Sequence, residues 1–160
     1  MRKIAIATAL VAAAVATPAM AGPNGTVTRT MDVVLNVTTA CTMTTSTTMD
    51  FGFLTSVTAN TQSTASATVR CTPNAAYTVK IDNGQNFGAG TQRKLKSTTG
   101  TATVDYNVFD STGTAAWPVA GVPGTGTGLD QTLNIVGKLA QTTEVAAGTY
   151  KDLLTITLDY

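Results

Sequence analysis

Few residues of this 160-residue chain could carry out covalent or metal chemistry. The chain contains no histidine, two cysteines and a single glutamate, Glu144. Acid–base or nucleophilic catalysis would therefore depend on scattered aspartates or on pairs of lysine, serine and threonine, and no spacing marks such a set. Asp105 and Asp110 lie within or at the end of one expected strand, where they are better interpreted as solubilising charges. The sequence predicts that the protein is not an enzyme and that it has neither a catalytic site nor a cofactor.

The first 21 residues have the pattern of a secretory signal peptide. Two basic residues at positions 2 and 3 precede an apolar run over residues 4–16, and AMA at 19–21 forms a small-x-small cleavage motif. The apolar run is too short to span a membrane well, so a membrane anchor is the less favoured interpretation. We expect an exported chain that begins at Gly22.

Export decides between two interpretations of Cys41 and Cys71. In an oxidising compartment an even pair of cysteines forms a disulfide, which here would close a loop of about thirty residues. Such a bond contributes about 3 kcal/mol, mostly by restricting the unfolded chain. A metal site is the alternative, but the chain has no histidine and no carboxylate cluster near either cysteine. We expect the disulfide and no metal ligands.

Composition and charge favour one extracellular β domain that does not bind nucleic acid. Charged residues make up 12% of the chain, and about a fifth of it is threonine, whose β-branched side chain suits a pleated surface. About 139 residues follow the expected signal peptide, which fits one domain. The exported part has eight basic and nine acidic residues, and its one basic run, RKLK at 93–96, is better interpreted as the solvated face of a strand.

Alternating segments separated by Gly, Asn, Pro and Thr turns predict an all-β sandwich of about seven strands. The candidate strands cover residues 26–37, 40–43, 49–54, 66–71, 76–82, 93–96, 102–110, 132–140 and 151–160. The alternation places these side chains inward: Val69, Cys71, Tyr77, Val79, Ile81, Val104, Tyr106, Val108, Leu133 and Ile135. DNG at 82–84 predicts a turn, because asparagine and glycine tolerate positive φ.

Residues 115–129, AAWPVAGVPGTGTGL, are interpreted as a flexible connection rich in glycine and proline. The GTGTG within them superficially looks like a phosphate cradle, but such a cradle lies between a strand and the N-terminus of a helix. The LDQTLNIV that follows predicts another strand instead. Trp117 could anchor a surface or a ligand, although partly buried packing is the favoured interpretation.

Two amphipathic segments stand at opposite ends of the exported chain. In the last ten residues, KDLLTITLDY, one face carries Leu154, Ile156, Leu158 and Tyr160, and no turn or partner strand follows them. In TVTRTMDVVLNV at 26–37, one face carries Val27, Met31, Val33, Leu35 and Val37, interrupted by Arg29. Periodicity alone favours an ordinary first strand of the sandwich for this segment. A sandwich that lacks its last strand would instead leave an apolar groove that another strand must fill.

Several motifs resemble those of the archaic chaperone–usher pilus subunits, the family that shares the spore coat protein U domain. They span nearly the whole exported sequence: MDVVLNVTTACTM, MDFG, ATVRCTPNAAYTVKIDNG, the R-K-L after it, VDYNVFD, Trp117 and AGTYKDLLTITLDY. The most specific features are the cysteine pair with DFG between its members, and GTYKD before a terminal alternating strand. One departure is Trp117-Pro118, where the family pattern has tryptophan followed by glycine.

The resemblance implies an immunoglobulin-like β-sandwich that lacks its final strand and is completed by a donor strand from a neighbouring subunit. It implies three parts, namely a signal peptide at 1–21, a donor extension at 22–37 and the pilin domain at 38–160. The donor face would consist of Val27, Met31, Val33, Leu35 and Val37. One edge of the acceptor groove would consist of Leu154, Ile156, Leu158 and Tyr160.

The resemblance also implies partners and a location. A periplasmic chaperone would first lend a strand to the groove, and identical or related subunits would then join head to tail at an outer-membrane usher to form a fibre. The chain would be exported through the periplasm to the cell surface, as a structural pilus subunit for surface adhesion and biofilm formation. A secreted or coat-associated adhesive or sugar-binding sandwich is the alternative, although the aromatic residues show no clustering in the sequence that marks a sugar-binding face.

Overall fold

The computed structural model of the protein describes residues 25–45, 48–88 and 92–160. The expected signal peptide at 1–21 lies outside these residues, as do residues 22–24 of the expected donor extension. The chain divides into an N-terminal unit that ends at Asn36 and a compact unit, Val37–Tyr160, which contains every strand assigned in the described residues. Within this described part, no helix is long and apolar enough to cross a membrane.

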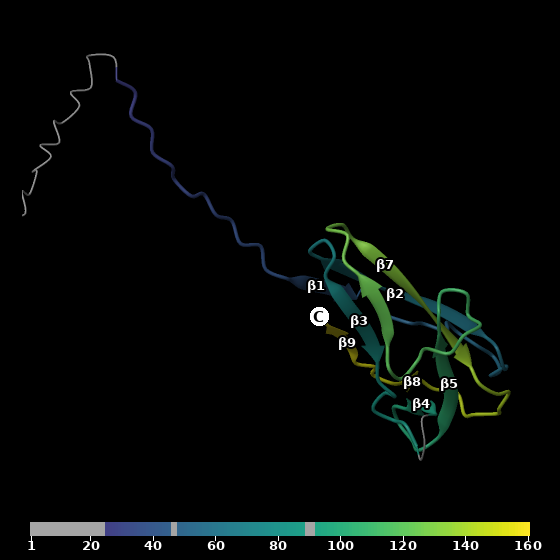
Figure 1. The fold of residues 1–160 in the computed structure, drawn as a ribbon. Coiled ribbons are helices and arrows are strands. Elements are labelled where there is room, and N and C mark those ends of the chain that lie inside the picture. The colour runs from purple at the N-terminus through teal and green to yellow at the C-terminus, as the bar shows by residue number, and fades with distance from the viewer. Residues whose placement is uncertain (1–24, 46–47, 89–91) are drawn as a thin grey trace, which may run out of the picture. The chain divides into compact units, whose positions relative to one another are not determined.

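Nine strands, counted over the described residues, form two antiparallel sheets (Figure 1). The larger sheet contains, in spatial order, β1 (Cys41–Thr45), β2 (Gln62–Cys71), β7 (Gln131–Leu139), β5 (Thr103–Phe109), β4 (Arg93–Ser97) and β8 (Tyr150–Lys151). The smaller sheet contains β6 (Val122–Thr125), β3 (Ala76–Ile81) and β9 (Ile156–Asp159). The chain passes repeatedly from one sheet to the other, so both sheets belong to one domain.

The core is built from side chains that alternate inward along the strands. In β5, Val104, Tyr106 and Val108 are buried and their neighbours are partly exposed. Nine of the ten side chains that the sequence places inward are buried, and Leu133 is half-buried. Trp117 is also buried, and its indole N–H donates a hydrogen bond to the carbonyl of Val79 at 3.4 Å, which confirms the packing interpretation of this residue.

Two predictions about local structure are wrong. Residues 49–54 do not form a strand, because Gly52 adopts φ +75° and its N–H donates to the Asp50 carboxylate at 2.8 Å, which turns the chain. The expected connection at 115–129 contains a strand, β6, which pairs with β3. The sequence did not indicate this strand, because proline and glycine are both uncommon in the interior of strands.

The two amphipathic end segments also differ from expectation. Residues 26–37 form no strand in this structure. Residues 150–160 form two short strands instead of one, since β8 pairs with β4 in the larger sheet and β9 pairs with β3 in the smaller sheet. Residues 152–155 therefore carry the chain across from one sheet to the other.

Candidate functional site

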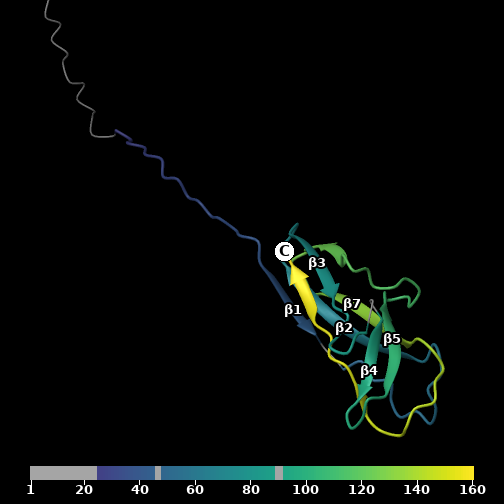
Figure 2. The same ribbon diagram turned by 90° about the horizontal axis from the view of Figure 1, so that it is seen from below.

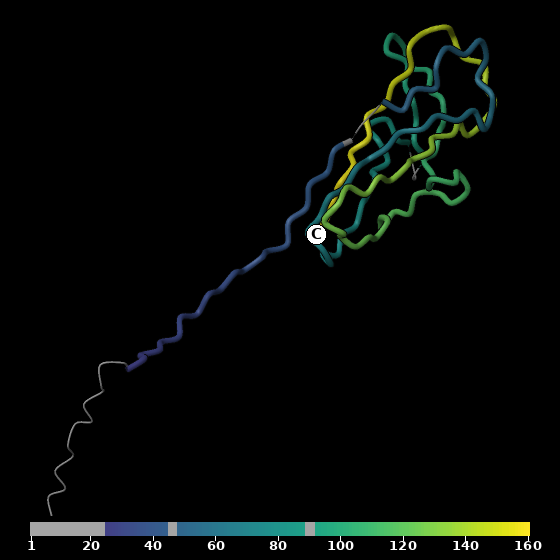
Figure 3. The backbone as a smooth tube through the Cα atoms, turned by 90° about the horizontal axis from the view of Figure 1, so that it is seen from above, coloured from purple at the N-terminus to yellow at the C-terminus, as the bar shows by residue number. Residues whose placement is uncertain are grey.

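Strands β1 and β9 are edge strands of different sheets, and they lie side by side (Figures 2 and 3). Among the described strands, β1 pairs only with β2, and β9 pairs only with β3. Each edge strand therefore presents one row of backbone N–H and C=O groups that has no partner strand in the described part of the chain. An additional strand can pair with such a row.

Apolar side chains from both strands lie beside these open edges. Leu154, Ile156 and Leu158 are half-buried and pack against the core. From β1, Cys41 and Met43 are half-buried against the same core. Tyr160, in contrast, is 65% exposed and does not pack with this group. The structure thus brings together three of the four residues for which the family resemblance implies a place at the groove edge.

A disulfide between Cys41 and Cys71 ties β1 to β2, as predicted. The two cysteines are directly opposite each other in the antiparallel register, with Cα atoms 4.1 Å apart. Because β1 has five residues and one neighbouring strand, this bond holds a short edge strand in register. Nowhere in the described residues do three or more potential metal ligands come together.

The opposite edges of the two sheets are built differently. Strand β6, at the other edge of the smaller sheet, contains Pro123, which cannot donate to a neighbouring strand. Strand β8, at the other edge of the larger sheet, has two residues. Proline and short length are common devices that protect a sheet edge from unwanted pairing. Strands β1 and β9 contain no proline and are longer than β8, and apolar side chains lie beside their open edges.

Asp152 anchors the crossover that places β9 in the smaller sheet. Its Oδ1 accepts hydrogen bonds from the backbone N–H groups of Gln85 and Asn86 at 3.0 and 3.1 Å, and from the Asn86 side-chain amide at 3.0 Å. Its Oδ2 accepts a hydrogen bond from the hydroxyl of Tyr106 at 2.7 Å. Burial raises the pKa of Tyr106 far above its usual value and the bond to Asp152 raises it further, so the phenol stays protonated and donates.

Asp82 anchors the other end of the same crossover. Its Oδ1 accepts hydrogen bonds from the N–H groups of Thr155 and Gly84, both at 2.9 Å. Burial alone would raise the pKa of Asp82, but these hydrogen bonds and the charge of Arg93 outweigh burial and lower the pKa. Asp82 is therefore ionised at neutral pH and holds the residue that precedes β9.

The glycine of the predicted DNG turn is required by this network. Gly84 adopts φ +81°, and a Cβ atom at this position would collide with the carboxylate of Asp152. The sequence predicted the turn and the inward position of Tyr106, but it did not identify Asp152 as a functional residue. No local pattern could have done so, because Asp152 and Tyr106 are 46 residues apart.

A family model described as the Spore Coat Protein U domain matches residues 27–157. The chain belongs to the spore coat protein U domain family. The matched residues include both edge strands but for the last residues of β9, and the whole of the crossover. Membership of this family places the chain among structural proteins and not among enzymes, in agreement with the prediction from its residues.

One solved structure supports the fold of this spore coat protein U domain. A chain in the crystal structure of the CsuC–CsuE chaperone–tip adhesion subunit pre-assembly complex, from the archaic chaperone–usher Csu pili of Acinetobacter baumannii, superposes with a TM-score of 0.56 at 23% identity. The match covers 78% of this chain and 40% of that chain. The E. coli Hda pilus minor tip subunit HdaB matches at 15% identity over 75% of this chain and 80% of its own, with a TM-score of 0.38, a likeness too distant to bear on the fold. No curated protein sequence matches the chain.

The predicted donor residues of this spore coat protein U domain are exposed. Exposed fractions lie between 75% and 85% for Val27, Met31, Val33, Leu35 and Val37. None of these side chains belongs to a strand or to the core of the compact unit. Two complementary features are therefore present in one chain, namely an exposed alternating segment and a pair of open apolar edges.

Proposed function

We propose that this protein is a structural subunit of an archaic chaperone–usher pilus that polymerises by donor-strand complementation. The observation that carries the proposal is the juxtaposition of β1 and β9, two neighbouring edge strands from different sheets whose outer edges have no partner among the described residues. A strand inserted between them would join the two sheets and cover the half-buried apolar side chains beside both edges. The compact unit then corresponds to an immunoglobulin-like sandwich that lacks its final strand.

The donor strand would come from residues 22–37 of another subunit. Its alternating face of Val27, Met31, Val33, Leu35 and Val37 is exposed and available. Burying five such side chains at roughly 1.5–3 kcal/mol each supplies about 7–15 kcal/mol, before the costs of ordering and association are subtracted. Period-two alternation also sets the register, because a slip of one residue would turn the apolar side chains away from the core.

This contact is head to tail, and a head-to-tail contact that does not close on itself builds a fibre. Each subunit would use its open edges to bind the N-terminal segment of the next subunit, and a periplasmic chaperone would protect those edges before assembly at an outer-membrane usher. The Csu complex similar in fold is described as a chaperone–subunit pre-assembly complex, which supports such a chaperone-bound stage. The fibre would act at the cell surface in adhesion and biofilm formation.

The test compares the exported chain, beginning at residue 22, with a variant that lacks residues 22–37. Both are expressed in the periplasm and examined by unboiled, non-reducing gel electrophoresis and by light scattering. We expect SDS-resistant ladders from the complete exported chain, and monomer or aggregate from the truncated variant. Two stable, soluble monomers would refute the proposal, since the open edges would then be satisfied within each chain.

A peptide experiment separates loss of the donor from loss of folding. A synthetic peptide of residues 26–37 is added to the truncated variant, and the melting temperature is measured. We expect a rise in melting temperature, because a bound strand stabilises the folded state by mass action. The matched control is the same peptide with Leu35→Asp, which we expect to produce little or no rise.

A further inference from the structure

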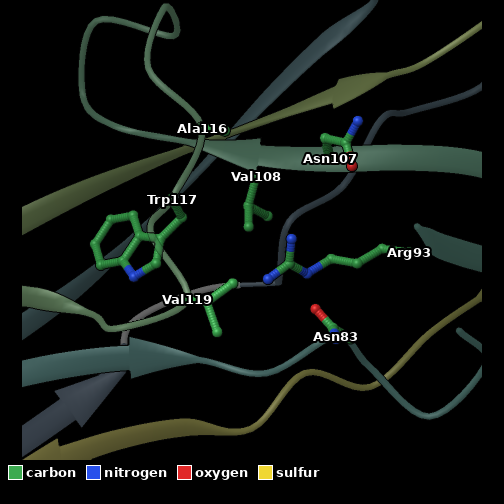
Figure 4. Close-up of a pocket in the computed structure, with 7 residues that line it drawn as sticks. All are labelled: Asn83, Arg93, Asn107, Val108, Ala116, Trp117 and Val119. Atoms are coloured by element: carbon green, nitrogen blue, oxygen red, sulfur yellow. The ribbon is translucent and has the colours of Figure 1, made fainter. Parts of the chain in front are cut away.

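A pocket of about 190 Å³ lies between the two sheets (Figure 4). Its walls come from the connection after β3, from β4 and β5, and from the segment before β6. The residues that matter most for its chemistry are Arg93, Asn83, Trp117 and Val119. None of the lining residues belongs to β1 or β9, so the pocket is separate from the proposed acceptor edges.

The guanidinium of Arg93 is the main polar group of this pocket. Arg93 is 7% exposed, and it is the one buried charged residue of the described chain. Its Nε donates to the carbonyl of Asp82 at 2.8 Å, and Nη2 donates to the carbonyl of Ile81 at 3.3 Å. In the described residues, Nη1 has no hydrogen-bond acceptor and no carboxylate forms an ion pair with the side chain. Figure 4 shows the guanidinium end directed into the pocket.

The environment of Arg93 favours an anion. Burial lowers the pKa of Arg93, and the negative charges of Asp82 and Asp152 act in the opposite direction. The guanidinium nevertheless stays protonated, because arginine does not lose its charge in proteins. Both neighbouring carboxylates are already engaged in anchoring the crossover. No carboxylate of the described residues lies within ion-pair distance of the guanidinium, so a carboxylate that enters this pocket would gain a charge-assisted hydrogen bond to it.

The remaining walls suit a small molecule with one polar and one apolar side. Trp117 is held in orientation by the hydrogen bond from its indole N–H to Val79, and Val119 is 82% exposed. The Asn83 amide makes no hydrogen bond to the described residues, and Figure 4 shows it beside the guanidinium. The volume is below the roughly 300–1,000 Å³ of pockets that hold drug-sized ligands, which limits the occupant to about one sugar ring or less.

We propose that this pocket binds a small carboxylate, either as a free acid or as the carboxylate of an acidic sugar unit. The guanidinium of Arg93 and the amide of Asn83 would contact the carboxylate, and Trp117 and Val119 would contact the rest of the molecule. This site does not depend on polymerisation, because its residues are separate from β1, β9 and the N-terminal segment.

The sequence offers a specific reporter for the test, since Trp117 is its one tryptophan. The full exported chain is titrated with glucuronate, acetate and glucose, and binding is followed by tryptophan fluorescence and by the NMR signal of the indole N–H. We expect glucuronate to change both signals and glucose to change neither. Acetate that binds as tightly as glucuronate would indicate a free-acid site, and acetate that binds at least about tenfold more weakly would indicate an acidic sugar unit.

Two outcomes would overturn the proposal. Absence of any change with glucuronate and acetate at tens of millimolar would mean that the pocket does not bind carboxylates. Glucose that binds as tightly as glucuronate would mean that the carboxylate is not what the pocket recognises.

A matched pair of variants tests the role of charge without removing the hydrogen bonds of Arg93. Val119→Glu places a carboxylate at an exposed wall of the pocket, and Val119→Gln places a neutral side chain of the same size there. We expect Val119→Glu to weaken glucuronate binding at least about tenfold more than Val119→Gln, because the new carboxylate competes for the guanidinium and repels the ligand. Equal binding by the two variants would contradict the assignment of Arg93 as the anion-binding group.

Discussion

Residues 27–37 and 154–160 have the same alternation of apolar and polar side chains, but they differ in the exposure of those side chains and in strand formation. The apolar side chains of the first segment are 75–85% exposed, and the segment forms no strand. In the second segment, Ile156 and Leu158 are half-buried in β9. Similar sequence patterns have therefore led to different local structures.

The difference lies in the available partner and not in the pattern. Strand β9 pairs with β3 through Thr78–Ile81 and covers one side of the core. The N-terminal segment pairs with no strand in the described part of the chain, and an isolated strand has neither hydrogen-bond partners nor a surface to cover. Alternation thus identifies a face that can be buried, whereas strand formation needs an open edge. The proposed function supplies that edge from another subunit.

The largest expected effect comes from a charge on the apolar face of the N-terminal segment. Leu35→Asp would place a carboxylate in the core of the neighbouring subunit, where an unpaired charge is costly. We expect it to abolish SDS-resistant multimers in unboiled gels. The stability of the lone subunit should not change, because Leu35 is 84% exposed there.

Val34→Asp is the matched control, since Val34 lies on the opposite face and is 75% exposed. It introduces the same charge one residue away, and multimers should persist. Equal loss of multimers with both variants would mean that the face of the segment does not matter, which would contradict insertion as a strand.

The second prediction places the same charge in β9. Ile156→Asp should destabilise the subunit itself by about 2–4 kcal/mol, because it removes a half-buried apolar side chain and adds a charge beside the core. Thr157→Asp, on the exposed face of β9, should cost less than about 0.5 kcal/mol. Urea denaturation of the chaperone-free subunit measures both values. A similar cost for the two variants would show that β9 does not bury one face.

The third prediction concerns the crossover that separates β8 from β9. Asp152→Asn replaces an acceptor of the Tyr106 hydroxyl with an amide of the same size, and we expect a loss of about 1–3 kcal/mol. Asp159→Asn makes the same chemical change in an exposed ion pair with Lys80 and should cost less than about 1 kcal/mol. Thermal unfolding of the two variants provides the comparison, and a larger cost for Asp159→Asn would contradict the anchoring role of Asp152.

Much of the fold could be predicted from the alternation of apolar and polar residues with a period of two. Strands β3 and β5 were predicted within about one residue at each end, because one face of each strand is buried and the other is not. The disulfide followed from export and an even number of cysteines, and the structure contains it. These features depend on local sequence or on composition, which one sequence shows directly.

The features that were missed depend on contacts between distant residues. Within KDLLTITLDY, Lys151 pairs with Lys96 in one sheet and Ile156 pairs with Ile81 in the other. This change of sheet is anchored by the bonds of Asp152 to residues far away in the sequence. The position of β1 beside β9 depends likewise on the order of strands, so Cys41 and Met43 were not recognised as neighbours of the predicted groove edge.

The smallest expected effect is a pH dependence of the hydrogen bonds by which Asp82 holds the residue that precedes β9. The pKa of Asp82 in the folded protein is lower than 3.8, the value expected for the unfolded chain. Ionised Asp82 therefore stabilises the fold fully at pH values above 3.8, and this contribution is lost as the pH falls through the lower pKa of the folded state. In Asp82→Asn this part of the acid dependence should disappear. Some acid dependence should remain, because hydrogen bonds led by that from Thr112 also lower the pKa of Asp110.

Hydrogen exchange can localise this effect and sharpen the contrast between the two segments. As the pH is lowered below 3.8, the amides of residues 155–159 should lose protection, because Thr155 loses an ionised acceptor and β9 has one strand partner. Exchange must be compared after correction for the intrinsic effect of pH. Residues 27–37 of the lone subunit should be unprotected throughout, since no strand partner exists for them in the described chain. Protection of both segments at neutral pH in the lone subunit would show that the N-terminal segment already pairs within its own chain. The difference between an unpaired N-terminal segment and a paired β9, on which the proposed donor-strand complementation depends, would then not exist.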